Sequence, residues 1–141
     1  MKNSVYSRIE VYTDGGSRGN PGQSAIGFLI YGPGEEIIEQ YSECIGIKTN
    51  NYAEYFAIIK SLNAAKQYNP QEVVIYTDSS LAYNQISGFW KIKDVEIKKM
   101  VFQINKEITN FKIFKILHIP REKNKEADRL VNIALNLNEV K

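Results

Sequence analysis

The apolar run EVVIYT, residues 72–77, constrains the fold of this chain more than any other segment. It is short and continuously apolar, which is typical of a strand that is buried on both faces of a sheet. Segments with helical periodicity lie on both sides of it in the sequence, at residues 49–68 and 79–86. Because a strand buried on both faces needs helices on both faces of its sheet, the run predicts an α/β fold.

The other segments complete a predicted element order of βββ-α-β-α-α-β-α. The first three strand-like segments partly alternate polar and apolar residues and follow one another closely, which predicts an antiparallel meander. The predicted strands cover residues 8–13, 25–31, 37–46, 72–77 and 111–119, and the predicted helices cover residues 49–68, 79–86, 93–111 and 122–137. The sequence therefore predicts a five-stranded mixed sheet with helices on both faces, in a single domain over residues 1–141.

The composition limits the kinds of site that the chain can form. Cys44 is the only cysteine and His118 the only histidine, which excludes an internal disulfide and any metal site built from several such residues. Carboxylates are then the natural metal ligands. The sequence has no run of about 20 apolar residues and no secretory signal, so we expect a cytoplasmic protein without a membrane span.

The net charge of +2 is small, but the lysines and arginines are concentrated in the second half of the chain. Such a distribution is consistent with a polyanionic partner, and solvated helix faces would give the same pattern.

A glycine-rich segment, YTDGGSRGNPGQ at residues 12–23, separates the first two predicted strands. A tight hairpin needs only about two turn residues. The length of the segment therefore predicts a loop that contacts another molecule.

Four acidic residues lie at the ends of predicted elements, and each has an ordinary structural explanation. Asp14 fits a turn and Asp78 fits a helix N-cap. Asn51 and Glu54 fit a capping box, with Asn51 as the N-cap. Asp128 lies where acidic residues complement a helix dipole, and it could also pair with neighbouring lysines.

Taken together, the positions of these carboxylates favour a shared site. Asp14 and Asp78 each end a strand that is predicted to be central, where ligand-binding groups gather in such sheets. Glu54 and Asp128 each lie near the start of a helix that would begin beside those strand ends. Carboxylates this close repel one another unless a cation neutralises them. Two Mg²⁺ ions held by shared carboxylates would do so, and they are suited to phosphodiester hydrolysis.

In its motifs and its element order, the sequence resembles the type 1 ribonuclease H family. Four blocks match in order: YTDGGSRGNPG, TNNYAEY, IYTDSSLAYNQISG and PREKNKEADRLVN. With the segments between them they cover residues 8 to about 137. The resemblance implies the ribonuclease H-like fold and endonucleolytic hydrolysis of the RNA strand of RNA–DNA hybrids. It also implies Mg²⁺ as cofactor, two ions with substrate bound and Mn²⁺ as an alternative, and products with 5′-phosphate and 3′-hydroxyl ends.

The resemblance assigns roles to individual residues. The metal-binding carboxylates of the family fall on the set already indicated by position: Asp14, Glu54, Asp78 and Asp128. The contacts of the family with the RNA strand fall on Asn20, Thr49, Asn50 and Asn51. Amide and backbone groups suit the 2′-hydroxyl, which both donates and accepts hydrogen bonds. Helix capping remains the alternative explanation for the two asparagines of TNN.

The same interpretation extends to the rest of the glycine-rich segment. Gly15 and Gly16 would let the backbone run close to a bulky duplex, where a side chain would collide. Arg18 becomes a candidate phosphate contact.

The sequence departs from the family pattern after its second predicted helix. Many members carry a basic helical protrusion there, whereas here SGFWKIKD, residues 87–94, leads almost directly into the next helix. The residues that would partly replace it are Lys91, Lys93, Lys98 and Lys99, with Phe89 and Trp90 as contact or core residues. We therefore expect weaker and more salt-sensitive binding of the hybrid. In addition, Ser80 stands where many relatives have a glutamine that touches nucleic acid.

A further departure concerns the mobile histidine that many members place before the last helix. His118 is predicted to lie on the fifth strand instead, and Arg121 lies in the loop, seven residues before Asp128. Arginine cannot act as a general acid at neutral pH, but it can hold a phosphate. We favour Arg121 for this position.

Two other functions fit the same residues. A non-catalytic binding module could keep the fold and the basic surface, since fold alone does not fix function. A related nuclease could act on another substrate, such as double-stranded RNA or single-stranded DNA. For the leading interpretation we expect a free-standing monomer that acts on the RNA–DNA hybrid and needs no obligate protein partner.

Overall fold

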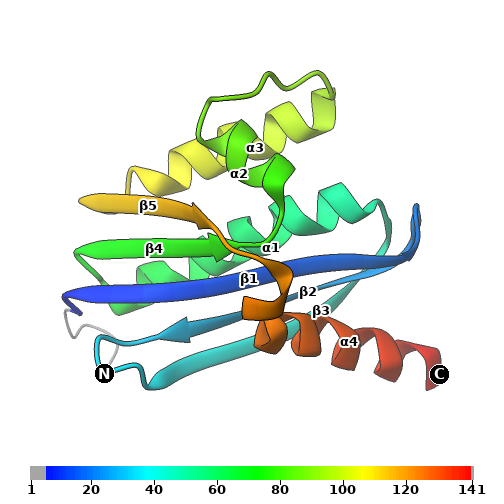
Figure 1. Ribbon diagram of the computed structural model, residues 1–141, viewed down its shortest axis with the longest axis horizontal. Helices are drawn as coiled ribbons and strands as arrows, with labels where there is room; N and C mark the ends of the chain where they lie inside the picture. The colour runs from blue at the N-terminus through cyan, green and yellow to red at the C-terminus, as the bar shows by residue number, and fades with distance from the viewer. Residues whose placement is uncertain (1–5, 141) are drawn as a thin grey trace.

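The sheet at the centre of the protein has five strands in the order β3-β2-β1-β4-β5. The structure is a computed structural model that describes residues 6–140 (Figure 1). The strands are β1 (Arg8–Gly19), β2 (Gly22–Tyr31), β3 (Ile37–Lys48), β4 (Glu72–Thr77) and β5 (Ile113–His118). The helices are α1 (Asn50–Ala65), α2 (Ser80–Ile86), α3 (Val95–Ile108) and α4 (Lys125–Val140), with short 3₁₀ turns η1 (Lys66–Tyr68) and η2 (Arg121–Lys123).

Helices cover both faces of this sheet, which confirms the predicted fold (Figure 1). Helix α1 packs on β1 and β2 from one face, and α3 packs against α1. Helix α4 covers β2 and β3 from the other face. Of the helices in the described residues, none is long and apolar enough to cross a membrane.

Strand β4 has the buried, central position that its apolar run predicts. It pairs in parallel with β1 on one side and with β5 on the other. Val73, Val74 and Ile75 are fully buried. The parallel pairing of β1 with β4 ends at Thr13 and Thr77, where β4 ends and β1 continues beside β2.

The predicted loop at residues 12–23 is wrong, because most of this segment is strand. β1 continues through Gly19 and pairs with β2 down to Gly22, so only Asn20 and Pro21 form the turn. The peptide bond between these two residues is cis. The many glycines suggested a loop, but here they are tolerated within an antiparallel ladder.

The helices α1 and α2 begin with caps other than those predicted. Thr49, not Asn51, caps α1, and its hydroxyl accepts the N–H of Tyr52. Ser79, not Asp78, caps α2 by accepting the N–H of Ala82. Glu54 and Asp78 are therefore not used for capping.

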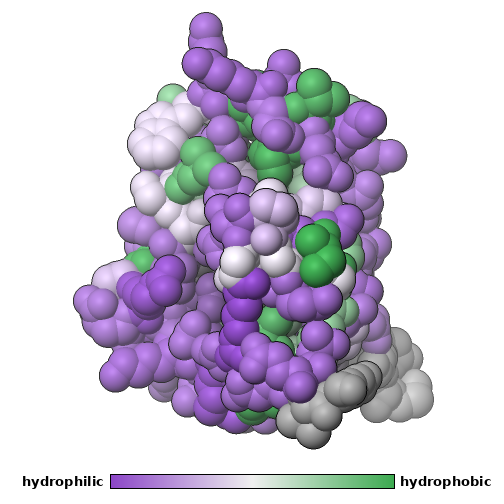
Figure 2. All heavy atoms as spheres, turned by 90° about the vertical axis from the view of Figure 1, so that its right-hand side faces the viewer, coloured by the Kyte–Doolittle hydropathy of each residue, from purple (hydrophilic) through white to green (hydrophobic). Residues whose placement is uncertain are grey.

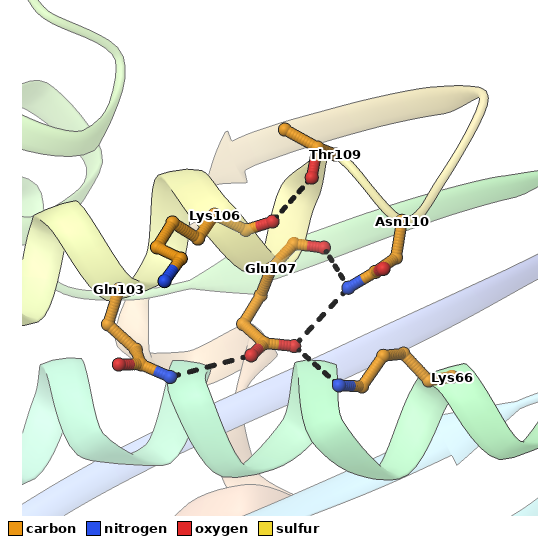
Figure 3. Close-up of polar contacts among 6 residues, drawn as sticks. All are labelled: Lys66, Gln103, Lys106, Glu107, Thr109 and Asn110. Carbon is orange, nitrogen blue, oxygen red and sulfur yellow. Dashed lines mark hydrogen bonds and ion pairs between the residues drawn. The ribbon is translucent and has the colours of Figure 1, made fainter.

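Helix α3 is joined to the end of α1 through Glu107. The Glu107 carboxylate lies 2.9 Å from the Lys66 ammonium and also contacts Asn110 and Gln103 (Figure 3). Together with the buried Ile97, Met100, Val101 and Ile104, this contact fixes α3 on the outside of α1.

Two glycines allow the helices to approach the sheet closely. A Cβ atom at Gly15 would lie 2.3 Å from the carbonyl carbon and oxygen of Ala53 in α1. On the opposite face, a Cβ atom at Gly27 would lie 2.8 Å from the carbonyl oxygen of Ala127 in α4. Gly15 is thus required by helix packing, which differs from the substrate clearance that the sequence suggested.

The neighbouring glycines offer a matched test of this packing. Replacing Gly15 by Ala should lower the free energy of unfolding by about 3 kcal/mol, because the obstructing atoms belong to backbone and cannot rotate away. Replacing Gly16 by Ala should change it by less than about 1 kcal/mol, since its Cβ would lie 3.4 Å from a Val131 methyl group. Urea denaturation of both variants measures the difference, and equal losses would contradict the assignment.

Candidate active site

Two aspartates lie side by side where the parallel pairing of β1 with β4 ends, Asp14 still within β1 and Asp78 just beyond β4. Thr13 and Thr77 form the last parallel pair of these strands, and Asp14 and Asp78 follow them directly. Asp14 is buried, while Asp78 is half-buried. The parallel register therefore brings together two carboxylates that are 64 residues apart in the sequence, the difference between 78 and 14.

Glu54 reaches the same place from the first turns of α1. Its Oε1 accepts a 3.1 Å hydrogen bond from the Gly15 N–H, which is possible because α1 lies directly on Gly15. Carboxylate oxygens of Asp14, Glu54 and Asp78 all lie within 4.8 Å of one another. These three side chains form a compact group that could hold a metal ion.

Asp128 approaches this group from the first turn of α4. It lies outside the set of oxygens within 4.8 Å, yet it is close enough to Asp14 for its charge and a hydrogen bond to raise the Asp14 pKa. The structure thus brings together all four carboxylates that the sequence singled out.

The crowding raises the pKa values of the two most buried acids. Burial, followed by the charges of Asp78 and Asp128, raises the pKa of Asp14 to about 8. Burial and then the charges of Asp14 and Asp78 raise the pKa of Glu54, although the Gly15 N–H and Arg121 act in the opposite direction. Without a cation, ionising all of these side chains at neutral pH costs free energy, because the negative charges repel one another.

The donor set fits a hard divalent cation. It consists of carboxylate oxygens, which Mg²⁺ and Mn²⁺ prefer, and it concentrates more negative charge than the surrounding groups neutralise.

Asn124 supports the site and was missed in the sequence. It is 1% exposed, and its Nδ2 donates to the Thr13 carbonyl at 2.8 Å and to Asp78 Oδ2 at 2.9 Å. Its Oδ1 has no partner within the described part of the chain. No sequence signal pointed to this role, because the helix predicted over residues 122–137 includes Asn124, whereas α4 begins at Lys125.

Arg121 and His118 lie on neighbouring segments but differ in their relation to the carboxylates. Arg121 is exposed in η2, and its charge acts on the pKa of Glu54, so the guanidinium lies within electrostatic reach of the group. His118 ends β5 opposite Thr77, which confirms the predicted strand position, and its ring lies 6.0 Å from that of Tyr83.

The residues assigned to RNA contacts gather where the β1–β2 turn meets the start of α1. Asn20 Oδ1 accepts the N–H of Asn50 at 2.8 Å, which ties the turn to the helix. Thr49 and Asn51 are exposed beside this bond. The side of the molecule that carries the hairpin end is largely hydrophilic, with only small separate apolar patches (Figures 1 and 2).

Ser80 and Arg18 make contacts within the protein. Ser80 is exposed in the first turn of α2 and its Oγ accepts a bond from Asn84 Nδ2 at 3.3 Å. Arg18 reaches across to α4, where it meets Glu139 and Asn132.

Comparison with known proteins gives consistent matches over nearly the whole chain. The RNase H family model matches residues 6–135. Ribonuclease HI of Halobacterium salinarum is 36% identical over 129 residues, which cover 92% of this chain and 65% of that protein. The chain spans between 36% and 65% of the length of the first curated relatives that it matches.

Two solved structures are similar to this chain at the same sequence identity. The crystal structure of RNase H1 from H. salinarum has a TM-score of 0.89 at 36% identity, covering 92% of this chain and 98% of that one. The crystal structure of LC11-RNase H1 in complex with an RNA/DNA hybrid has a TM-score of 0.88 at 36% identity, with the same coverage.

The raised pKa of Asp14 predicts a pH-dependent stability. An acid whose pKa rises on folding, here from 3.8 to about 8, destabilises the folded protein progressively as the pH increases between these values. In metal-free buffer, Asp14→Asn should therefore raise the free energy of unfolding by about 2 kcal/mol or more at pH 8. Near pH 4 the gain should be small. Denaturation of both proteins at both pH values measures it.

A control for this comparison is Glu96→Gln, because Glu96 is exposed on α3. A stability gain in Asp14→Asn that is the same at both pH values would contradict the assigned cause.

The buried bonds of Asn124 predict a second effect on stability. Asn124→Ala removes the donor to Thr13 and Asp78 and should lower the free energy of unfolding by about 1–3 kcal/mol. Asn124→Asp keeps the shape but faces both acceptors with a carboxylate, so its loss should be larger at pH 8 than at pH 5. Asn136→Ala, at an exposed position of α4, is the control and should stay within about 0.5 kcal/mol of the wild type.

Proposed function

The chain belongs to the RNase H family, and from this membership we propose that it is an endoribonuclease that hydrolyses the RNA strand of RNA–DNA hybrids. The observation that carries the proposal is the group formed by Asp14, Glu54 and Asp78, with Asp128 beside it. The complex of LC11-RNase H1 with an RNA/DNA hybrid supports the choice of substrate, since that protein has the same fold at 36% identity.

The carboxylates would hold divalent metal, in our proposal two Mg²⁺ ions, with Mn²⁺ as a substitute. Bound metal would activate the attacking water and stabilise the leaving oxygen, which gives 5′-phosphate and 3′-hydroxyl ends. Within the protein, the Gly15 N–H orients Glu54, and Asn124 orients Asp78. These neutral donors fix the acids without cancelling the negative charge that metal binding requires.

Arg121 is proposed to hold a phosphate of the RNA strand beside the carboxylates. It is exposed, has no ion pair within the described residues, and lies within electrostatic reach of Glu54. Because a guanidinium keeps its proton at neutral pH, its contribution would be charge and hydrogen bonding, not proton transfer.

The junction between the β1–β2 turn and α1 is proposed to recognise the RNA strand. The bond between Asn20 and Asn50 holds two backbone segments together, while Thr49 and Asn51 stay exposed for 2′-hydroxyl groups. Gly16 and Ser80 complete the proposed contact surface. Gly15 is buried against Ala53, so we leave it out of this surface.

The connection between α2 and α3 is proposed to contact the rest of the hybrid. Phe89 and Trp90 are 69% and 49% exposed, which argues against a role in the core for either ring. Lys91 and Lys93 follow them in the same exposed segment. Lysines and exposed aromatic rings are typical of surfaces that bind nucleic acid.

We also propose that the enzyme acts as a monomer. All four carboxylates come from one chain, so the site needs no residue from a second copy.

Cleavage of a labelled RNA–DNA hybrid tests the function. With Mg²⁺ the wild type should cut the RNA strand, and EDTA should abolish cutting. Asp78→Asn should slow cleavage by at least about a hundredfold, since it weakens metal binding that is worth several kcal/mol in the transition state. Glu96→Gln, at an exposed position of α3 that is not one of the four carboxylates, should cleave like the wild type.

The same assay separates the alternatives. Tight binding of the hybrid without turnover at any divalent metal would instead indicate a binding module. Faster cleavage of double-stranded RNA or single-stranded DNA in parallel reactions would indicate a nuclease of different specificity.

A further inference from the structure

The sequence made Arg18 a candidate phosphate contact, but in the structure its guanidinium contacts side chains of helix α4. Its Nη1 lies 2.6 Å from Glu139 Oε2, and its Nη2 donates to Asn132 Oδ1 at 3.1 Å. The residue belongs to the paired part of β1 just before the turn, so these contacts join the hairpin to α4.

Asn132 connects Arg18 to Asp128. Its Nδ2 donates to the Asp128 carbonyl at 3.0 Å and to Asp128 Oδ2 at 3.3 Å. A guanidinium can only donate hydrogen bonds, so Arg18 requires the carbonyl oxygen of the Asn132 amide to face it. The NH₂ group of Asn132 must then face Asp128. Arg18 therefore fixes which end of the amide Asp128 meets.

Asp128 is the carboxylate that most needs such support. The other three have oxygens within 4.8 Å of one another, and the Gly15 N–H and Asn124 hold two of them. Asp128 lies outside that set on a separate helix, and it is only half-buried. Its side-chain direction relative to Asp14 is therefore set by few contacts, of which the bond from Asn132 is one.

We propose that Arg18 and Asn132 are positioning residues that hold the Asp128 carboxylate toward Asp14 in the arrangement that binds metal. This proposal depends on the proposed function, in which Asp128 is a metal ligand. Residues that hydrogen-bond to metal ligands commonly change metal affinity by about 10–100-fold when they are removed.

The Mg²⁺ dependence of hybrid cleavage tests the proposal. Asn132→Ala should raise the Mg²⁺ concentration for half-maximal rate by about tenfold, with KM for the hybrid at saturating Mg²⁺ unchanged. Arg18→Ala should act in the same direction but less strongly. The double variant should be no worse than Asn132→Ala alone, because Arg18 acts through Asn132. Arg129→Ala, on the exposed side of α4, is the matched control.

A direct phosphate contact by Arg18 would give a different pattern. Arg18→Ala would then raise KM and salt sensitivity, and it would do so equally in the Asn132→Ala background. That pattern would overturn the proposal.

A second variant guards against simple loss of folding. Asn132→Asp keeps the shape and the partner of Arg18, but it replaces the donor that faces Asp128 with a carboxylate. Thermal denaturation checks that it is folded under the assay conditions, and it should then still raise the Mg²⁺ concentration for half-maximal rate. Normal Mg²⁺ dependence in Asn132→Asp would contradict the proposal.

Crystal structures of the metal-free wild type and Asn132→Ala give a readout that does not involve activity. We expect the Asp128 carboxylate to turn away from Asp14 in the variant, and an unchanged orientation would overturn the inference. In an Asp128→Asn background, Asn132→Ala should have no further effect on Mg²⁺ dependence. Failure of the wild type to cleave would instead refute the proposed function, so the two failures are distinguishable.

Discussion

The close contact between β1 and α1 at Gly15 is the constraint on which the site depends. With no side chain at this position, the helix lies directly on the strand and Glu54 receives the Gly15 N–H at 3.1 Å. The same strand delivers Asp14 one residue earlier, next to Asp78 at the end of β4. Packing of α1 on Gly15 therefore places Glu54, and the parallel register of β1 with β4 places Asp14 and Asp78 beside it.

The hydrogen-bond donors that orient the acids are neutral, so the site keeps its negative charge. Glu54 is oriented by a backbone N–H, Asp78 by the Asn124 amide and Asp128 by the Asn132 amide. A direct ion pair would have lowered the pKa values and reduced the attraction for metal. Instead, burial and mutual repulsion raise the pKa of Asp14 to about 8, a cost of folding that metal binding would relieve.

The elements with a strong local pattern could be predicted from the sequence, and so could the carboxylates at their ends. The apolar run of β4 is an example, because its burial on both faces leaves a signal within six residues. The extension of β1 through Gly19 could not be predicted, since it depends on pairing with the distant half of the hairpin and, at Gly15, on contact with α1. The bond from Arg18 to Asn132 joins residues 114 positions apart, so no local pattern reveals it. The role of Asn124 could not be predicted for the same reason, because its partners lie on β1 and beyond β4.

The glycines also bear on how inactive relatives of such a protein should be identified. Gly15 and Gly27 face α1 and α4 from adjacent strands, and both are needed because backbone atoms of those helices lie where a Cβ would be. A descendant that had lost hydrolysis would still need them in order to fold. Their presence in a homologue is therefore a marker of architecture, and under the proposed function the carboxylates with their amide partners would distinguish a working enzyme from a pseudoenzyme.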